Sequence, residues 1–493
     1  MPLPALIEIV PLDKPVHAAI TVPGSKSITN RALILAALAD GETTLEGALW
    51  SEDTQVMVEC LQELGFMVNV APDPNELCNR TITVYGKGGA VPRGGTTEQP
   101  LELFVGNAGT AARFLAAFVC LGEGVYRLHG VQRMHERPQA ELFAALRELG
   151  YQVEAEHLNE KLPVRILVSG SSGVRLRFPV RKDKPEGSGV QSCSVSIENS
   201  SQFASALLLC ANAGRWNVHV VGENAEESPY VAMTTELIEV FPKKGGAFRI
   251  EPDASSGSYF LAADYLIPSD EHLEYSERFG IEVPTRSLQA VTVADWPSSD
   301  WQVDVKFLHN PVLHGLDLAF GLGETPEGRK EMQTGRRLGV WDGVKRGESI
   351  SRKRDLGDSI MTAIVLAPLS IGSIQFTDLG RLRVQECERV VALRTELTRC
   401  GAKVIEEGDT LTVYPSELHG AEIETYDDHR MAMCFAILGL KVPGIKIKDP
   451  ACVKKTFPNF FQKLATPPPK GLGVTIRDVR TGRALGLDEL FAT

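Results

Sequence analysis

The chain has 493 residues, of which 51 are Lys or Arg and 63 are Asp or Glu, so its formal net charge is −12. Hydrophobic residues make up 43% of the chain, with 45 Gly and 29 Pro, a composition typical of a globular protein of two or three domains. This composition excludes the classes of disordered and fibrous proteins. An acidic chain has no overall attraction for nucleic acids or anionic membranes, so we expect any bound anion to be small and held by clustered cations.

The cysteines and the N-terminus bear on the cellular compartment. The nine Cys residues are scattered without a CxxC pair, and a chain of this size needs no disulfides, so we predict reduced thiols. The first residues include Glu8 and Asp13 and lack the basic and apolar segments of a leader sequence. No stretch approaches roughly 18 uninterrupted apolar residues. We therefore expect a cytoplasmic protein without a membrane span.

One local pattern recurs six times: a few small or polar residues followed by an abruptly apolar, Ala-rich segment that is typical of a buried helix. Strand-like runs such as residues 81–84 and 411–414 fall between the copies. The alternation predicts an α/β protein built from repeated units. In chain order the copies begin at residues 25–31, 107–113, 199–202, 255–258, 357–359 and 428–430.

The small polar residues at these places have two interpretations. Each can be a simple helix cap, because its side chain accepts a hydrogen bond from an orphan backbone N–H group. In three copies, however, Lys or Arg follows at the helix start, as at Lys26, Arg113 and Arg430, where the helix dipole disfavours a cation by about 0.3–1 kcal/mol. Helix N-termini with added cations bind phosphate and carboxylate groups. We infer that several helix N-termini converge on one anionic ligand.

Three further basic segments extend this set: RMHERP at 133–138, RLRVQECER at 381–389 and KKTFP at 454–458. Taken singly, each is more often a solvated surface than a site. Asp358 and Glu386 accompany these cations, and a carboxylate beside anionic substrates suggests proton transfer. HExxH, GxSxG, P-loop and dinucleotide-binding motifs do not occur in the sequence, so the predicted chemistry uses no metal and no cofactor.

Eight blocks spread over residues 15–465 together resemble the 5-enolpyruvylshikimate-3-phosphate synthase family of enolpyruvyltransferases. In the family's order they are PGSKSITNRALILAALA, LFVGNAGTAARFLAA, RMHERP, SSQFASALLL, DASSGSYFLAA, RVQECER, YDDHRMAMCFA and KKTFPNFF. The resemblance implies an α/β fold of two domains, each an inside-out barrel of three βαβαββ-type units, with the active site in the interdomain cleft. It implies an N-terminal lobe of residues 21–252 and a C-terminal lobe of residues 1–20 and 253–465, with an atypical insertion at about 269–353. Residues 466–493 form a tail without an assigned role.

The resemblance also implies a reaction of the shikimate pathway, which leads to chorismate and the aromatic amino acids. The enolpyruvyl group of phosphoenolpyruvate passes to the 5-hydroxyl of shikimate 3-phosphate, giving 5-enolpyruvylshikimate 3-phosphate and phosphate. The implied enzyme is a monomer that has these small-molecule substrates and no nucleic-acid or membrane partner.

The site residues are implied position by position. Asp358 is the general base for the 5-hydroxyl, Glu386 transfers a proton at the methylene carbon, and Lys26 and Lys455 stabilise the leaving phosphate. Implied shikimate 3-phosphate ligands are Lys26, Ser27, Arg31, Ser200, Ser201, Gln202, Tyr230, Asp358, Arg381 and Gln385. Implied phosphoenolpyruvate ligands are Lys26, Asn107, Gly109, Thr110, Arg137, Gln202, Arg389, His429, Arg430 and Lys455.

Several positions depart from the family pattern. Gln385 stands in place of a Lys, a loss expected to weaken shikimate 3-phosphate binding by about 1.5–3 kcal/mol unless Arg381 compensates. Glu227 replaces a Ser whose hydroxyl Ser228 supplies if the alignment shifts by one residue. The charged segments at 323–337 and 343–355 can be surface loops or interaction sites, and we favour the loop interpretation.

Two alternatives are kept. A UDP-N-acetylglucosamine enolpyruvyltransferase shares the fold and the phosphoenolpyruvate chemistry, but generally carries a Cys or Asp in the segment that is 126–138 here, which contains neither. A degenerate, non-catalytic anion-binding paralogue is suggested by Gln385 and Glu227.

Overall fold

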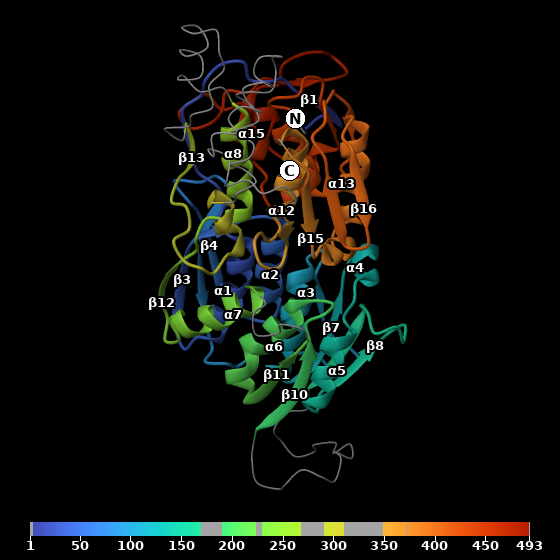
Figure 1. The fold of residues 1–493 in the computed structure, drawn as a ribbon. Helices are drawn as coiled ribbons and strands as arrows, with labels where there is room; N and C mark the ends of the chain where they lie inside the picture. The colour runs from blue at the N-terminus through green and yellow to red at the C-terminus, as the bar shows by residue number, and fades with distance from the viewer. Residues whose placement is uncertain are drawn as a thin grey trace. The chain divides into compact units, whose positions relative to one another are not determined.

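The computed structural model describes residues 3–168, 190–222, 229–267, 290–309, 349–370 and 372–492. The chain divides into two compact units (Figure 1). Unit 1 consists of Met1–Val22, Pro252–Ser298 and Val303–Thr493, and unit 2 of Pro23–Glu251 and Ser299–Gln302. Among the described residues, no helix is both long enough and apolar enough to cross a lipid bilayer.

The described part of unit 2 contains three sheets. The first has the strand order β12 (Gly246–Arg249), β3 (Glu42–Leu49), β5 (Asn79–Tyr85) and β4 (Val68–Pro72), and the second has the order β6 (Leu101–Phe104), β7 (Gly124–His129), β9 (Val164–Val168) and β8 (Gln152–Ala155). In both, the first pair is parallel and the next two pairs are antiparallel. The third sheet is the parallel pair β10 (Gln191–Ser196) and β11 (Trp216–Val221).

Three apolar helices pack against one another in the core of unit 2: α1 (Lys26–Leu38), α3 (Gly109–Phe118) and α6 (Ser201–Gly214) (Figure 1). Residues 28–37 of α1 and all of α3 are buried. A helix that is apolar on every side is stable only when it is covered all round, so the sheets must lie outside the helices. The remaining helices of this unit are α2 (Glu52–Glu63), α4 (Gln132–Glu136), α5 (Ala140–Glu148) and α7 (Pro229–Val240).

Unit 1 repeats this arrangement. Its sheet of β14 (Ser349–Ser351), β15 (Ile374–Thr377), β17 (Thr410–Val413) and β16 (Val404–Glu407) again has one parallel and then two antiparallel pairs. A second sheet has the order β18 (Glu422–Ile423), β19 (Lys446–Lys448), β1 (Leu6–Ile9) and β20 (Ile476–Asp478), and β13 (Val291–Val293) pairs with β2 (Ala18–Ile20). The central helices are α8 (Ala254–Leu266), α12 (Ile360–Leu366) and α14 (His429–Leu438), with α13 (Arg389–Arg399) and α15 (Phe460–Ala465) around them.

The six predicted helix starts are confirmed, because each begins one of these six central helices. The capping interpretation holds for half of them. The side chains of Ser200, Asp253 and Asp428 accept a hydrogen bond from the first turn of their helices. The N-cap residues of α1, α3 and α12 make no such side-chain bond, so their N-termini keep backbone donors that no capping side chain uses.

Parts of the 269–353 segment belong to the regular sheets. β13 pairs with β2, and β14 pairs with β15. The interpretation of 343–355 as a surface loop is therefore wrong for its last residues, because β14 is a sheet strand and Ser351 and Arg352 are buried. The other charged segment, 323–337, lies outside the described residues.

The C-terminal segment is folded into unit 1. β20 pairs antiparallel with β1, so β1 lies between β19 and β20. Ile476, Leu490 and Ala492 are buried in the same core as α14. An ion pair of 2.7 Å joins Arg483 Nη2 to Glu489 Oε1 at the 3-10 turn Leu487–Glu489. The tail thus completes a sheet and covers part of the core.

Leu490→Ala is expected to lower the free energy of unfolding by about 2–5 kcal/mol, because it leaves a cavity under the tail. Leu487→Ala is the matched control, since that side chain is 42% exposed whereas Leu490 is fully buried. Chemical denaturation followed by tryptophan fluorescence measures both variants. Equal stability of the two would show that the tail does not contribute to the core.

Candidate active site

In unit 2, two guanidinium groups gather at the N-terminus of α3. A Cβ atom on residue 109 would lie 2.6 Å from Arg113 Nη1 and 2.6 Å from Arg137 Nη2, so a side chain there would displace the ends of both arginines. Arg137 Nη1 donates to the carbonyl of Asn107 at 3.2 Å. Arg113 donates to the carbonyls of Gly109 and Pro138 at 3.0 and 3.2 Å. Positive charge is thereby concentrated where the helix dipole is also positive.

Gln202 connects this group to the start of α6. Its Oε1 accepts from Arg113 Nη1 at 3.0 Å, and its Nε2 donates to Thr110 Oγ1 at 3.1 Å. Its backbone N–H donates to the capping hydroxyl of Ser200 at 3.3 Å. Ser201, the first residue of α6, is buried beside it. The structure thus brings together six predicted residues of unit 2, Asn107, Gly109, Thr110, Arg137, Ser200 and Gln202. The contacts run through Arg113, which was predicted as a cation at a helix start but is not among the ligands that the family resemblance implies.

Arg31 is buried where α1 meets α6 and α7. Four of its five N–H groups are used inside the protein: Nε donates to Thr234 Oγ1 at 2.7 Å, Nη1 to Ser27 O at 2.8 Å, and Nη2 to Ser205 Oγ and Tyr230 O. Its guanidinium carbon lies 5.3 Å from the centroid of the Phe114 ring. Burial lowers the Arg31 pKa to about 10, so the group stays charged at neutral pH. Arg31 therefore offers a ligand its charge and at most one hydrogen bond.

Lys26 is held by a carboxylate that sequence reasoning missed. Its Nζ lies 3.1 Å from Oδ2 of Asp53, a residue near the start of α2 whose side chain is almost completely buried. The partners are 27 residues apart, and nothing in the local sequence signals the contact. Lys26 is the first residue of α1, so the ion pair fixes the ammonium beside a helix N-terminus.

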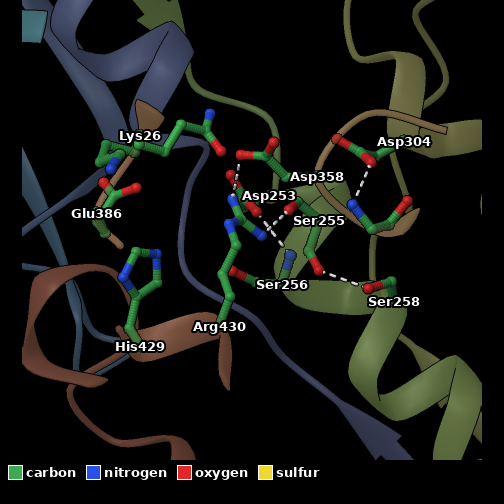
Figure 2. Close-up of polar contacts among 12 residues, drawn as sticks. Lys26, Asp253, Ser255, Ser256, Ser258, Asp304, Asp358, Glu386, His429 and Arg430 are labelled. Atoms are coloured by element: carbon green, nitrogen blue, oxygen red, sulfur yellow. Dashed lines mark hydrogen bonds and ion pairs between the residues drawn. The ribbon is translucent and has the colours of Figure 1, made fainter. Parts of the chain in front are cut away.

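In unit 1, Asp358 lies between two guanidinium groups. Arg352 Nη2 is 2.6 Å from Asp358 Oδ1, and Arg430 Nη2 is 3.1 Å from Asp358 Oδ2. Figure 2 shows Arg430 reaching from the start of α14 to both Asp358 and Ser255 of α8. Burial opposes ionisation of Asp358, but Arg430, Arg352 and Arg389 outweigh it and hold the Asp358 pKa far below its usual range. Asp358 is thus a carboxylate throughout the neutral range.

A second buried acid lies near Asp358. Asp304, in the 3-10 turn Val303–His309, accepts from the backbone N–H of Ser359 at 2.8 Å. Figure 2 shows this bond, and the cap that Asp253 provides for Ser256 N at 2.6 Å. Burial and the nearby charge of Asp358 raise the pKa of Asp304. Neither Asp304 nor Asp253 had been predicted at the site.

Two further cations of unit 1, Arg389 and Lys455, contact Glu386. Its carboxylate is 2.8 Å from Arg389 Nη2 and 3.1 Å from Lys455 Nζ. Arg389 is also bound by Asp428, whose Oδ2 is 2.6 Å from Nε. Burial opposes the charge of Arg389, but Asp428, Glu386 and Asp358 outweigh it and raise the Arg389 pKa. Asp428 has a second function, because its Oδ1 accepts from Arg430 N at 2.9 Å.

The other predicted residues are described within their own units. Gln385 Oε1 accepts a hydrogen bond from Arg389 Nη1, so its amide oxygen faces a cation of its own unit. His429 is buried as the first residue of α14, and Arg381 is half-buried in the 3-10 turn Gly380–Val384. Tyr230 is in the first turn of α7, whereas Glu227 and Ser228 lie outside the described residues.

Each unit therefore presents a cluster of buried or half-buried cations at the N-termini of its central helices, and unit 1 adds two carboxylates that contact them. Such clusters suit phosphate and carboxylate groups, and the carboxylates can move protons. Within the described residues, no group of three or more His, Cys, Asp or Glu side chains is placed to hold a metal ion.

Comparison with known proteins gives one consistent result. A relative from Opitutus terrae named 3-phosphoshikimate 1-carboxyvinyltransferase is 36% identical over 479 residues, covering 94% of this chain and 98% of its own. One of the same name from Nostoc punctiforme is 33% identical over 476 residues, covering 93% and 98%.

Two solved structures share the fold. EPSP synthase from Acinetobacter baumannii has a TM-score of 0.60 at 17% identity, covering 96% of this chain and 100% of its own. The enolpyruvyl transferase NikO from Streptomyces tendae has a TM-score of 0.57 at 14% identity, covering 98% and 100%. The model of the family described as EPSP synthase (3-phosphoshikimate 1-carboxyvinyltransferase) matches residues 11–273 and 324–464. With most of its length matched, the chain belongs to the EPSP synthase family.

Proposed function

We propose that this enzyme transfers the enolpyruvyl group of phosphoenolpyruvate to the 5-hydroxyl of shikimate 3-phosphate and releases phosphate. The observation that carries the proposal, beside membership of the family, is the pair of carboxylates in unit 1. Asp358 and Glu386 each contact two cations, and both side chains are only 12–13% exposed. Addition of a hydroxyl to C2 of an enol phosphate needs a base for the hydroxyl and an acid for the methylene carbon, and two such carboxylates supply them.

In the first step, Asp358 takes the proton of the 5-hydroxyl while the hydroxyl oxygen bonds to C2 of phosphoenolpyruvate. Glu386 delivers a proton to C3, and Lys455, 3.1 Å away, can return a proton to Glu386. The tetrahedral adduct then loses phosphate from C2 and a proton from C3, which restores the C2=C3 double bond and gives the enol ether product. Cations beside the phosphate, Lys26 and Lys455, lower the barrier by stabilising its developing charge.

The cations fall into two classes according to how many of their N–H groups donate hydrogen bonds within the protein. Arg31 and Arg389 use most of their donors within the protein, so they contribute mainly charge. Arg137 donates to Asn107 O, and its Nη2 lies at the N-terminus of α3. Its planar fork is suited to the carboxylate or phosphate of phosphoenolpyruvate. Arg430 contacts Asp358 and is expected to exchange part of this contact for the substrate.

The shikimate 3-phosphate ligands are proposed as Lys26, Ser27, Arg31, Ser200, Ser201, Gln202, Tyr230, Asp358, Arg381 and Gln385. The support from the structure is strongest for the α6 start, where Ser200 and Gln202 lie on an ordered helix N-terminus. The UDP-N-acetylglucosamine alternative is not favoured, because the family model and the relatives carry the shikimate name.

The purified protein is expected to release phosphate from phosphoenolpyruvate only when shikimate 3-phosphate is present, with formation of the enolpyruvyl product checked by mass spectrometry. Asp358→Asn should lower kcat by about 10²–10⁴-fold, because it removes the base. Asp300→Asn, at an exposed position, should leave kcat unchanged.

A folded protein without turnover would contradict the proposal and favour the non-catalytic paralogue. Turnover with UDP-N-acetylglucosamine in place of shikimate 3-phosphate would select the alternative enzyme.

Arg137→Gln is expected to raise the KM for phosphoenolpyruvate by about tenfold or more, because loss of a charge-assisted contact costs roughly 1.5–3 kcal/mol. Arg133→Gln is the matched control, since Arg133 lies in the same segment but is exposed and pairs with Glu136. Steady-state kinetics at saturating shikimate 3-phosphate measure both. Equal effects of the two substitutions would remove Arg137 from the phosphoenolpyruvate site.

A further inference from the structure

Arg352 is a buried cation with no part in the reaction as described above. It follows β14, and its backbone N–H donates to Thr377 O at 3.1 Å, which extends the pairing of β14 with β15. Its side chain is 6% exposed, whereas its neighbours Lys353 and Arg354 are exposed. In the run SRKRD, therefore, one cation points inward and two point to solvent.

The loop that carries Arg352 is held in place by short polar contacts. Ser351 Oγ accepts from the backbone N–H groups of Lys353 and Arg354, both at 3.2 Å, and Asp355 Oδ2 accepts from Ser351 N at 2.8 Å. Ser351 Oγ also donates to Asp378. These bonds fix the backbone on both sides of Arg352, so its guanidinium reaches Asp358 from a rigid base.

The two oxygens of Asp358 are divided between two arginines. Oδ1 is 2.6 Å from Arg352 Nη2, and Oδ2 is 3.1 Å from Arg430 Nη2. The two arginines differ in their other contacts. Arg430 also contacts Ser255 and Tyr259 and lies in the first turn of α14. Among the described residues, the Arg352 side chain has Asp358 alone as its partner. A buried arginine is stable only with such a partner.

The charges around Asp358 come from several elements. Arg352 lies on its own loop, Arg430 on α14 and Arg389 on α13, while the acid Asp304 faces it from the 3-10 turn Val303–His309. Asp253 at the start of α8 and Tyr259 within α8 act on Arg430. If Arg430 moves toward a bound anion, Asp304 remains a like charge near Asp358, and Arg352 and Arg389 remain to balance it.

We propose that Arg352 is a positioning residue for this reaction: it holds Asp358 Oδ1, so that Oδ2 is the oxygen that takes the proton of the 5-hydroxyl once Arg430 turns to phosphoenolpyruvate. The O–H bond of the substrate breaks, an O–H bond to Asp358 forms, and the freed electron pair bonds to C2 of phosphoenolpyruvate. The π pair of the C2=C3 bond forms a C–H bond at C3 with the proton from Glu386. The inference rests on the proposed function, since it needs Asp358 to be the base.

Two substitutions separate the charge of Arg352 from its geometry. The kcat–pH profile reports the substrate complex, in which Arg430 has turned to phosphoenolpyruvate and Arg352 still pairs with Asp358. Arg352→Gln removes this remaining charge, so the pKa of Asp358 in that complex rises and the acid limb of the profile should move upward by roughly one to three pH units. Arg352→Lys keeps the charge but loses the planar fork, so its acid limb should stay near that of the wild type while its plateau falls. KM for both substrates should change little, because Arg352 acts through Asp358.

Lys353→Gln is the matched control, an exposed cation one residue away, and its profile should equal that of the wild type. An unchanged acid limb in Arg352→Gln would overturn the proposal. So would a raised KM at constant kcat, which would make Arg352 a substrate ligand instead.

A measurement without substrate separates this inference from the proposed function. The folded pKa of Asp358 lies below its unfolded value, so the ion pairs of Asp358 stabilise the fold above about pH 4 and lose this effect as the pH falls. Arg352→Gln raises the folded pKa of Asp358 toward its unfolded value, so the ion pairs of Asp358 contribute less to the stability of the variant. Because the unfolded state is the same for both proteins, the Tm difference between wild type and variant should stay constant from about pH 7 to about pH 4 and narrow only as the pH falls below about 4.

If the enzyme turns over but the Tm difference between wild type and Arg352→Gln does not change with pH, the role of Arg352 is overturned and the proposed function stands. If this Tm difference narrows but the wild-type protein releases no phosphate, the proposed function is overturned, and with it the catalytic role of Arg352. The ion pair between Arg352 and Asp358 would still stand.

Discussion

A guanidinium group inside a protein needs an acceptor or an anion for nearly every N–H, because an unmatched buried charge costs several kcal/mol. This constraint organises both units. Arg31 is satisfied by hydroxyls and carbonyls, which leave its charge uncompensated, whereas Arg389 is matched by Asp428 and Glu386. The first kind of arginine attracts an anion, and the second holds a carboxylate in a fixed place. A site that must bind two phosphorylated acids and also move protons needs both kinds.

The arrangement of the helices makes these cations available. Because α1, α3 and α6, like α8, α12 and α14, are mostly apolar along their length, the cations of the site lie near their N-terminal ends. Polar groups farther along these helices, such as Ser205 and Thr362, are buried and hydrogen-bonded within the protein. The backbone donors and the dipole of each N-terminus then add to the charge of the nearby side chains. Function follows here from the way an all-round apolar helix must be buried.

Sequence reasoning predicted the parts of this structure that are encoded locally. The six helix starts were found because a polar-to-apolar change is visible within a few residues, as at Asp428 before α14. Contacts between distant residues were not found: Lys26 and Asp53 are 27 residues apart, and Arg113 meets Gln202 across 89. Arg352 was misread for a different reason, since a run of Arg and Lys normally predicts a solvated surface. Its inward direction depends on the pairing of β14 with β15, which composition does not reveal.

The position of β1 has a consequence for how the protein is made. β1 comes from the first ten residues, yet its neighbours in the sheet are β19 and β20, from the last fifty. During synthesis, unit 1 must wait for the end of the chain before this sheet can close, whereas every residue of unit 2 has been made by Gln302. Domains generally fold as units while the chain emerges. Unit 2 can therefore fold on the ribosome, and the N-terminal strand must stay unpaired until almost the whole polypeptide has been translated.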